Sequence, residues 1–193
     1  MTFGSFNHAP KIAEPSLRCW AGILRGMPDA RLQLVGVPAG RAQARLAGRF
    51  AAMGVDASRL TMHPRLPFGD FLRRLDEVDI ALDSLPYGGG TTTFDALWMG
   101  LPVIACSGER SVERSAASIL AALGLEAWIA PSHEDYVRLA LAHAADTAGI
   151  ARLRATLRER LRASPLMDEA GFARDVESAY RALWRDWCGR RLA

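Results

Sequence analysis

The chain has 193 residues, half of them hydrophobic and 23% charged, with a formal net charge of +3. This length and composition predict a single domain with a sizeable core, and the dispersed basic residues argue against nucleic-acid binding. No apolar run is long enough to span a bilayer and the amino terminus is not a signal peptide, so no membrane association is expected.

The predicted elements alternate along the chain. Residues at helical spacing such as Leu17, Trp20 and Leu24 indicate amphipathic helices, and apolar runs such as 78–82 indicate buried strands. The pattern predicts an α/β fold with a doubly wound, six-stranded parallel Rossmann-like sheet over 1–146, followed by a C-terminal helical extension over 147–193. Strands are expected at 2–6, 31–37, 60–62, 78–82, 101–106 and 127–130, and helices at 15–27, 41–53, 68–75, 94–99, 112–123, 133–145, 149–163 and 169–189.

Residues 83–100 (DSLPYGGGTTTFDALWMG) are the most informative stretch. Glycines let a backbone approach an anion, and a helix start offers unpaired N–H groups and the positive end of its dipole. The run Gly88, Gly89, Gly90, Thr91, Thr92 and Thr93 between a strand and a helix therefore suits a phosphate or diphosphate. An ordinary strand-to-helix turn with a threonine cap is the alternative. The spacing matches neither a P-loop nor GxGxxG, which also disfavours an NAD-binding protein.

A second polar loop, with Asn7, His8 and Lys11, follows the first predicted strand. In the common strand order 3-2-1-4-5-6, the loops after strands one and four meet at the ligand-binding edge of the sheet. Lys11 is the single lysine among 24 basic side chains, which hints at a need for a compact ammonium charge. The order therefore predicts that Lys11 faces a phosphate held by the threonine loop.

Two further candidates carry alternatives. Asp95, near the threonine helix start, could accept both hydroxyls of a ribose or simply complement the helix dipole. Arg74, on the short helix before strand four, could contact a base or be a solvated surface charge.

The cysteines and histidines indicate no metal site. Cys19, Cys106 and Cys188 are odd in number and widely spaced, which predicts buried thiols in a reduced, cytoplasmic protein. The four histidines lack ligand spacing, so no metal is expected.

Four segments carry a family resemblance: SFNHAPKI at 5–12, ALDSLPYGGGTTTFDALWMGLPV at 81–103, RSAASIL with LGL between 114 and 125, and SPLMD at 164–168. Together they resemble the O-GlcNAc transferase, or SPINDLY-type, family of GT-B glycosyltransferases, over the C-terminal half of the catalytic region. The resemblance implies an inverting transfer of GlcNAc from UDP-GlcNAc to Ser/Thr hydroxyls of protein acceptors, with no cofactor besides this donor substrate.

The resemblance also implies residue roles. Lys11 would contact the donor diphosphate and stabilise the departing UDP, Thr91 and Thr92 would hold the diphosphate, Asp95 the ribose, and Arg74 would lie near the uracil. Members of the family often have glutamine at His8, and the animal enzymes have histidine at Gly90, lysine near Phe68 and histidine near Phe71.

The family's amino-terminal Rossmann-like half, with an active-site histidine, and its tetratricopeptide array have no counterpart in these 193 residues. We therefore expect a donor-binding half that binds nucleotide weakly and catalyses little alone. The alternative is a non-catalytic nucleotide-binding or interaction module that docks with a separate partner. The pattern Tyr180, Trp184, Trp187 is typical of a packing stripe, and in GT-B proteins the last helix crosses to the other domain. UDP-glucose users exist among relatives, so the sequence leaves the sugar open.

Overall fold

The computed structural model describes residues 1–191 and contains one six-stranded sheet. The strand order is β3-β2-β1-β4-β5-β6 and every pairing is parallel, which confirms the predicted doubly wound arrangement. Phe3 pairs in register with both Leu32 and Ile80, so β1 lies at the centre beside β2 and β4. The strands are β1 (Thr2–Ser5), β2 (Arg31–Val35), β3 (Leu60–His63), β4 (Ile80–Leu82), β5 (Val103–Cys106) and β6 (Ile129–Ala130).

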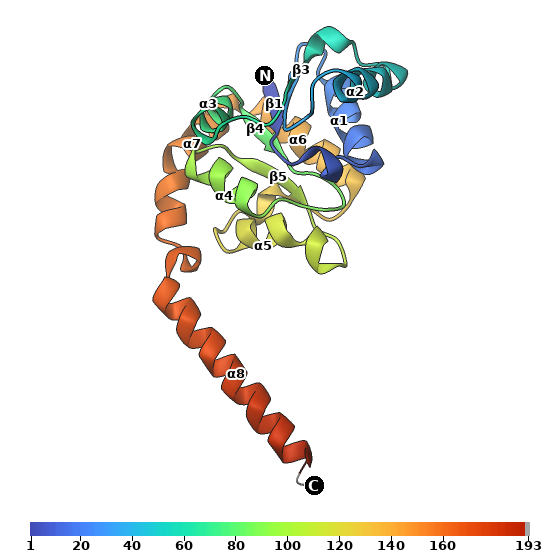
Figure 1. The fold of residues 1–193 in the computed structure, drawn as a ribbon. Helices are drawn as coiled ribbons and strands as arrows, with labels where there is room; N and C mark the ends of the chain where they lie inside the picture. Colours follow the sequence, from blue (N-terminus) through green and yellow to red (C-terminus); the bar gives the residue numbers. More distant parts are fainter. Residues whose placement is uncertain (192–193) are drawn as a thin grey trace.

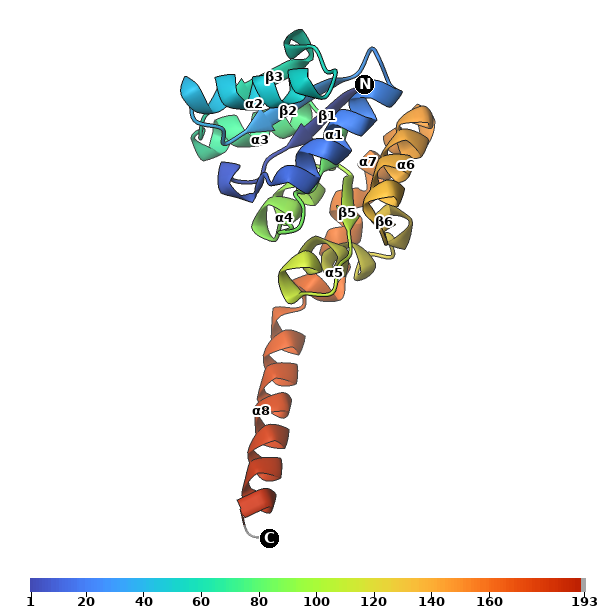
Figure 2. The ribbon, with the colours of Figure 1, turned by 90° about the vertical axis from the view of Figure 1, so that its right-hand side faces the viewer.

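Helices cover both faces of the sheet (Figures 1 and 2). α1 packs between α2 and α6 on one side, and α4 packs between α5 and α7 on the other. This arrangement follows from right-handed crossovers that run outward in both directions from β1 and β4. The helices are α1 (Glu14–Gly26), α2 (Arg41–Ala52), α3 (Phe68–Asp76), α4 (Thr91–Trp98), α5 (Ser115–Ala121), α6 (His133–Ala145), α7 (Thr147–Arg162) and α8 (Glu169–Arg191), with short 3-10 turns η1 (Ala9–Lys11), η2 (Ala57–Arg59), η3 (Ser111–Glu113), η4 (Glu126–Trp128) and η5 (Pro165–Met167).

The core lies between the sheet and these two helix layers. The apolar face predicted for the first helix is buried, with Leu17 and Trp20 fully covered. Trp20 Nε1 donates to the Tyr136 hydroxyl at 3.4 Å, and both side chains have no exposed surface. This contact joins α1 to α6 beneath the centre of the sheet.

Element boundaries differ from the predicted ones in two informative places. α4 begins at Thr91, three residues before the expected helical pattern, because Gly90 already accepts the amides of Thr93 and Phe94. The single helix expected over 112–123 is divided into η3 and α5, because the Glu113 carboxylate accepts the Arg110 amide and closes a separate turn.

The two C-terminal helices differ in their packing. α7 buries Ile150, Leu157 and Leu161 in the core, so it belongs structurally to the sheet domain. α8 runs away from that domain in both views (Figures 1 and 2), and Tyr180 and Trp184 are 70% and 63% exposed. Within the part of the chain that the structure describes, Tyr180 and Trp184 are therefore not covered by the sheet domain, and the crossing of this helix to another domain stays a prediction. None of the described helices is both long and apolar enough to cross a membrane.

This difference predicts opposite effects of two truncations. A chain that ends at Asp168 loses α8 and should keep the free energy of unfolding of the sheet domain within about 1 kcal/mol, since α8 buries little. A chain that ends at Asp146 also loses three core side chains and should be less stable by roughly 5 kcal/mol or more. Urea unfolding followed by circular dichroism measures both. Equal losses would contradict the division between α7 and α8.

Candidate functional site

The two polar loops singled out in the sequence meet at the carboxyl edge of the sheet. β1 and β4 are neighbours, so the segment that follows β1, with η1, lies beside the segment from Asp83 to Gly90 that follows β4. Parallel α/β sheets bind ligands at this edge, where the strand order reverses. The topology therefore places the candidate site between η1 and the start of α4.

Asp83 is the group that joins the two loops. Its Oδ1 atom accepts the Gly89 amide at 2.7 Å and the Asn7 Nδ2 atom at 2.9 Å. The side chain is almost fully buried, and this burial raises the pKa of Asp83 to about 6, against the lowering effect of its hydrogen bonds and of the Lys11 charge. At neutral pH the carboxylate is thus ionised and its amide partners stabilise it.

Asn7 extends this contact to the threonine helix. Its Oδ1 atom accepts the Thr92 hydroxyl at 2.9 Å while its Nδ2 atom donates to Asp83. Asn7 is buried and both polar atoms of its side chain have partners within the protein. Its place in the site is therefore as a link between β1, β4 and α4.

Lys11 lies directly over the glycine loop. Its Nζ atom donates to the Gly88 carbonyl at 3.0 Å and lies 4.0 Å from the centre of the Tyr87 ring. A cation held over an aromatic face beside a helix start favours an anion between them. The strand order thus brings the single lysine to the glycine loop, and its contact with a phosphate stays a prediction.

The glycine loop has a fixed course. The Ser16 hydroxyl of α1 accepts the Leu85 amide at 2.7 Å and donates to the Leu85 carbonyl at 3.0 Å. At Gly89 a Cβ atom would lie 2.6 Å from Thr93 Oγ1 and 2.7 Å from Thr92 Oγ1. Any side chain there would push the loop away from the helix start, so only glycine fits.

The three threonines of α4 occupy different environments. Thr91 is exposed at the mouth of the site, Thr92 is half-buried and bonded to Asn7, and Thr93 is buried in the helix packing. The first amides of a helix have no partner within it, so the start of α4 offers N–H donors at this edge of the sheet. Gly90, at the N-cap position, leaves open space around its Cα atom.

A cavity of about 360 Å³ opens beside this helix start. One wall is polar, with Thr91, Thr92 and Asp95, and burial raises the pKa of the Asp95 carboxyl above its usual value. Another part of the lining is apolar: Phe71 packs edge-on to Phe6 at 5.7 Å and stacks on Phe68 at 6.3 Å between ring centres. The remaining lining residues are His8, Val35, Gly36, Arg65 and Leu66. A flat apolar group joined to a polar, anionic one would fit this shape.

Arg74 is not gathered into this cavity. Its Nη1 atom donates to both carboxylate oxygens of Glu77 at 2.8 Å, and it is not among the residues that line the cavity. A contact between Arg74 and a base would require that ion pair to open. Conversely, Asp83, Arg65 and Leu66 were given no role in the sequence analysis. For Asp83 the available signal was a carboxylate placed directly between an apolar strand and a glycine loop.

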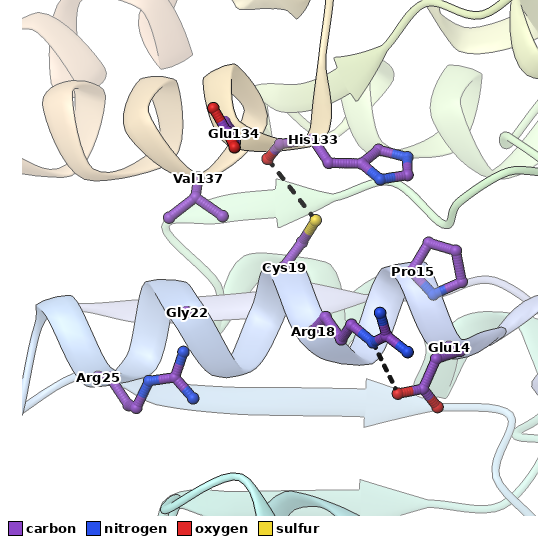
Figure 3. A pocket seen from close by; sticks show the side chains of 9 residues that line it. All are labelled: Glu14, Pro15, Arg18, Cys19, Gly22, Arg25, His133, Glu134 and Val137. Atoms are coloured by element: carbon purple, nitrogen blue, oxygen red, sulfur yellow. Dashed lines mark hydrogen bonds and ion pairs between the residues drawn. The ribbon is translucent and has the colours of Figure 1, made fainter.

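A wider hollow of about 770 Å³ lies between α1 and α6 (Figure 3). Several of its polar groups are paired: the Cys19 thiol donates to the His133 carbonyl at 3.7 Å, Arg18 binds Glu14, and Arg25 donates to the Met53 carbonyl. Among its described lining residues none belongs to the predicted site. Within residues 1–191 no cluster of three or more His, Cys, Asp or Glu side chains is arranged to hold a metal ion.

Comparisons with known proteins point to one family. Residues 1–176 match the profile described as Glycosyl transferase family 41. The chain is 35% identical over 191 residues to the probable UDP-N-acetylglucosamine–peptide N-acetylglucosaminyltransferase SPINDLY of Solanum lycopersicum, covering 97% of this chain and 20% of that protein. It is 28% identical over 185 residues to the corresponding transferase of Caenorhabditis elegans, covering 96% and 16% respectively. The chain thus spans about a fifth of the length of these curated relatives.

Solved structures agree. A mutant of the Thermobaculum terrenum O-GlcNAc transferase superposes with a TM-score of 0.90 at 38% identity, covering 97% of this chain and 36% of that one. A sucrose-phosphate synthase from Thermosynechococcus elongatus has a TM-score of 0.66 at 16% identity, covering 96% and 46%, and shares the fold alone. The sheet and its helices therefore have the GT-B fold expected from the sequence.

The buried Asp83 predicts a pH-dependent stability. Its folded-state pKa, about 6, lies above the ordinary value of 3.8, so ionisation is disfavoured in the folded protein. This group's contribution to the free energy of unfolding is present below about pH 4 and is lost as the pH rises through 6, by roughly 3 kcal/mol in all. Asp83→Asn lacks this titration. Urea unfolding of both proteins from pH 4.5 to 8 should show the variant gaining relative stability as pH rises, and parallel profiles would contradict the assignment.

Proposed function

The chain belongs to glycosyl transferase family 41, and from that membership and the site geometry we propose that residues 1–191 form the part of a glycosyltransferase that binds the nucleotide-sugar donor, UDP-GlcNAc. The observation that carries this proposal is the contact of Lys11 with the Gly88 carbonyl, in the loop that leads into the threonine start of α4, beside a cavity lined in part by phenylalanines. A diphosphate joined to a nucleoside requires a cation, the N–H donors of a helix start and an apolar surface for the base, and this edge supplies all three.

The cavity sets the orientation of the donor. The diphosphate would lie at the start of α4, within reach of the Lys11 ammonium and of the exposed Thr91 hydroxyl. The nucleoside would extend into the cavity, where Asp95 can accept the ribose hydroxyls and Phe71 can pack against the base. Burial favours the neutral form of Asp95, and hydrogen bonds donated by two hydroxyls would offset that cost.

The chemistry follows from this placement. In the transfer, an acceptor hydroxyl attacks the anomeric carbon of the sugar, and the bond from that carbon to the diphosphate oxygen breaks. The bonding electrons pass to the leaving UDP, so negative charge grows on the phosphate that faces Lys11 and the helix start. A fixed cation and fixed N–H donors stabilise this charge more in the transition state than in the ground state.

The relatives' names supply the reaction class: N-acetylglucosaminyl transfer to a peptide. We propose Ser/Thr hydroxyls of proteins as acceptors and no metal or further cofactor. His8 and Asp95 line the cavity assigned to the nucleoside, and Asp83 is buried and engaged, so we assign none of them to take the acceptor proton. We therefore expect donor binding without appreciable transfer by these residues alone, and transfer when the other half of the cleft is supplied.

Lys11→Ala should lower the affinity for UDP by about tenfold or more, because one charge-assisted contact to the diphosphate is lost. Lys11→Arg should recover only part of this, since a guanidinium cannot occupy the same point above Tyr87. Isothermal titration of the wild type with UDP, UDP-GlcNAc, UDP-glucose and NAD measures these affinities and identifies the preferred donor.

Arg181→Ala, at an exposed ion pair on α8, is the matched control and should leave UDP binding unchanged. If Lys11→Ala bound UDP as the wild type does, the site assignment would be wrong. If the wild type bound none of the four ligands, the proposed function would fail for these residues.

The role given to Asp95 predicts a selectivity change. The wild type should prefer UDP to 2′-deoxy-UDP, because one hydroxyl partner of Asp95 is missing in the latter. Asp95→Leu should bind both about equally and more weakly than the wild type binds UDP, by roughly tenfold. Competition titration against UDP gives the ratios, and an unchanged preference in the variant would remove Asp95 from the ribose site.

A further inference from the structure

The buried carboxylate of Asp83 reaches both halves of the candidate site without lining the cavity that faces the donor. It accepts from Gly89 in the glycine loop and from Asn7 after β1, two positions far apart in sequence. Burying an ionised carboxylate is costly unless donors surround it. A buried negative charge next to the proposed anion site is therefore not explained by packing alone.

The hydrogen bonds around Asp83 have a fixed direction. An ionised carboxylate only accepts, so Asn7 must turn its NH₂ group toward Asp83 and its oxygen toward Thr92. The Thr92 hydroxyl then donates to that oxygen at 2.9 Å. The side chain of Asp83 thus sets the orientation of Asn7, and Asn7 sets the rotamer of a threonine at the helix start.

The backbone of Asp83 is held equally firmly. Its carbonyl accepts the Tyr136 hydroxyl of α6 at 2.8 Å, and Tyr136 in turn accepts the indole N–H of Trp20 in α1. All three side chains are buried. The position of the carboxylate is therefore defined by the core, and the glycine loop is held to it through the Gly89 amide.

We propose that Asp83 is a positioning residue for the donor diphosphate, which fixes the Gly89 amide, Asn7 and Thr92 relative to Lys11 before the donor arrives. This inference rests on the proposed function. It assigns Asp83 no contact with substrate: its effect passes through the glycine loop and through Asn7.

Electrostatics makes the inference sharply testable. A negative charge near a diphosphate site repels the ligand, so neutralising Asp83 without any positioning role should strengthen UDP binding or leave it unchanged. Asp83→Asn keeps the shape and one acceptor oxygen but removes the charge that fixes the direction of the network. Weaker phosphate binding in this variant is therefore the opposite of what charge alone would give.

The experiment compares UDP with uridine by NMR titration of the full chain. Asp83→Asn should lower UDP affinity by about tenfold or more while uridine affinity stays within about twofold, because only the phosphate part of the site is disturbed. A merely structural role would weaken both ligands together. The control is Asp79→Asn, because Asp79 accepts the Thr2 amide at 2.7 Å near the opposite end of β4. It should change neither affinity.

Two further variants test the hydrogen bonds that connect Asp83 through Asn7 to Thr92. Asn7→Leu removes the link to Thr92 and should reduce the ratio of UDP to uridine affinity as Asp83→Asn does. Thr92→Val should reduce UDP affinity in the wild type but have a much smaller effect in the Asp83→Asn background, because the network is already lost. Circular dichroism confirms that each variant is folded, and Asn7→Leu serves if Asp83→Asn is not.

The outcomes separate the two proposals. If the wild type fails to bind UDP, the proposed function fails. If the wild type binds UDP and Asp83→Asn keeps or improves that affinity, or loses uridine binding to the same extent, the positioning role of Asp83 is overturned while the donor site stands.

Discussion

A buried carboxylate must be surrounded by donors, and this requirement organises the carboxyl edge of the sheet. Asp83 lies at the end of a central strand, where the Gly89 amide and the Asn7 side chain meet its charge. Those donors belong to the two loops that reach the ligand side. Satisfying the Asp83 charge inside the protein therefore also shapes the surface at which we propose that the donor diphosphate binds.

Side chains of α1 and α6 hold the main chain at that edge in place. Tyr136 and Trp20 connect the end of β4 to both α6 and α1, and Ser16 holds the main chain of Leu85. Loops on parallel sheets are positioned by such scaffolds, since the loop itself buries little. Charge stabilisation requires donors at fixed distances, so rigidity at this edge would serve the donor site that we propose.

Much of the fold could be predicted from the sequence because its signals are local. Alternating strands and helices indicated the parallel sheet, and the strand order brought Lys11 to the glycine loop, where the structure places it. The role proposed for Asp83 depends on burial and on a contact across 76 residues, and the position of this carboxylate between a strand and a glycine loop reveals neither. For Arg74 the sequence left two possibilities, a contact with a base or a solvated surface charge. In the structure its guanidinium binds Glu77, three residues along the chain.

The contact of the single lysine with Gly88 and Tyr87 has a practical consequence. Lys11 is the only lysine among these 193 residues, so within them reagents that acylate lysine side chains have a single target. Acylation of Lys11 removes its positive charge, and a bound anion would shield it. Covalent labelling followed by mass spectrometry can therefore report occupancy of this one position in a mixture, without any engineered probe.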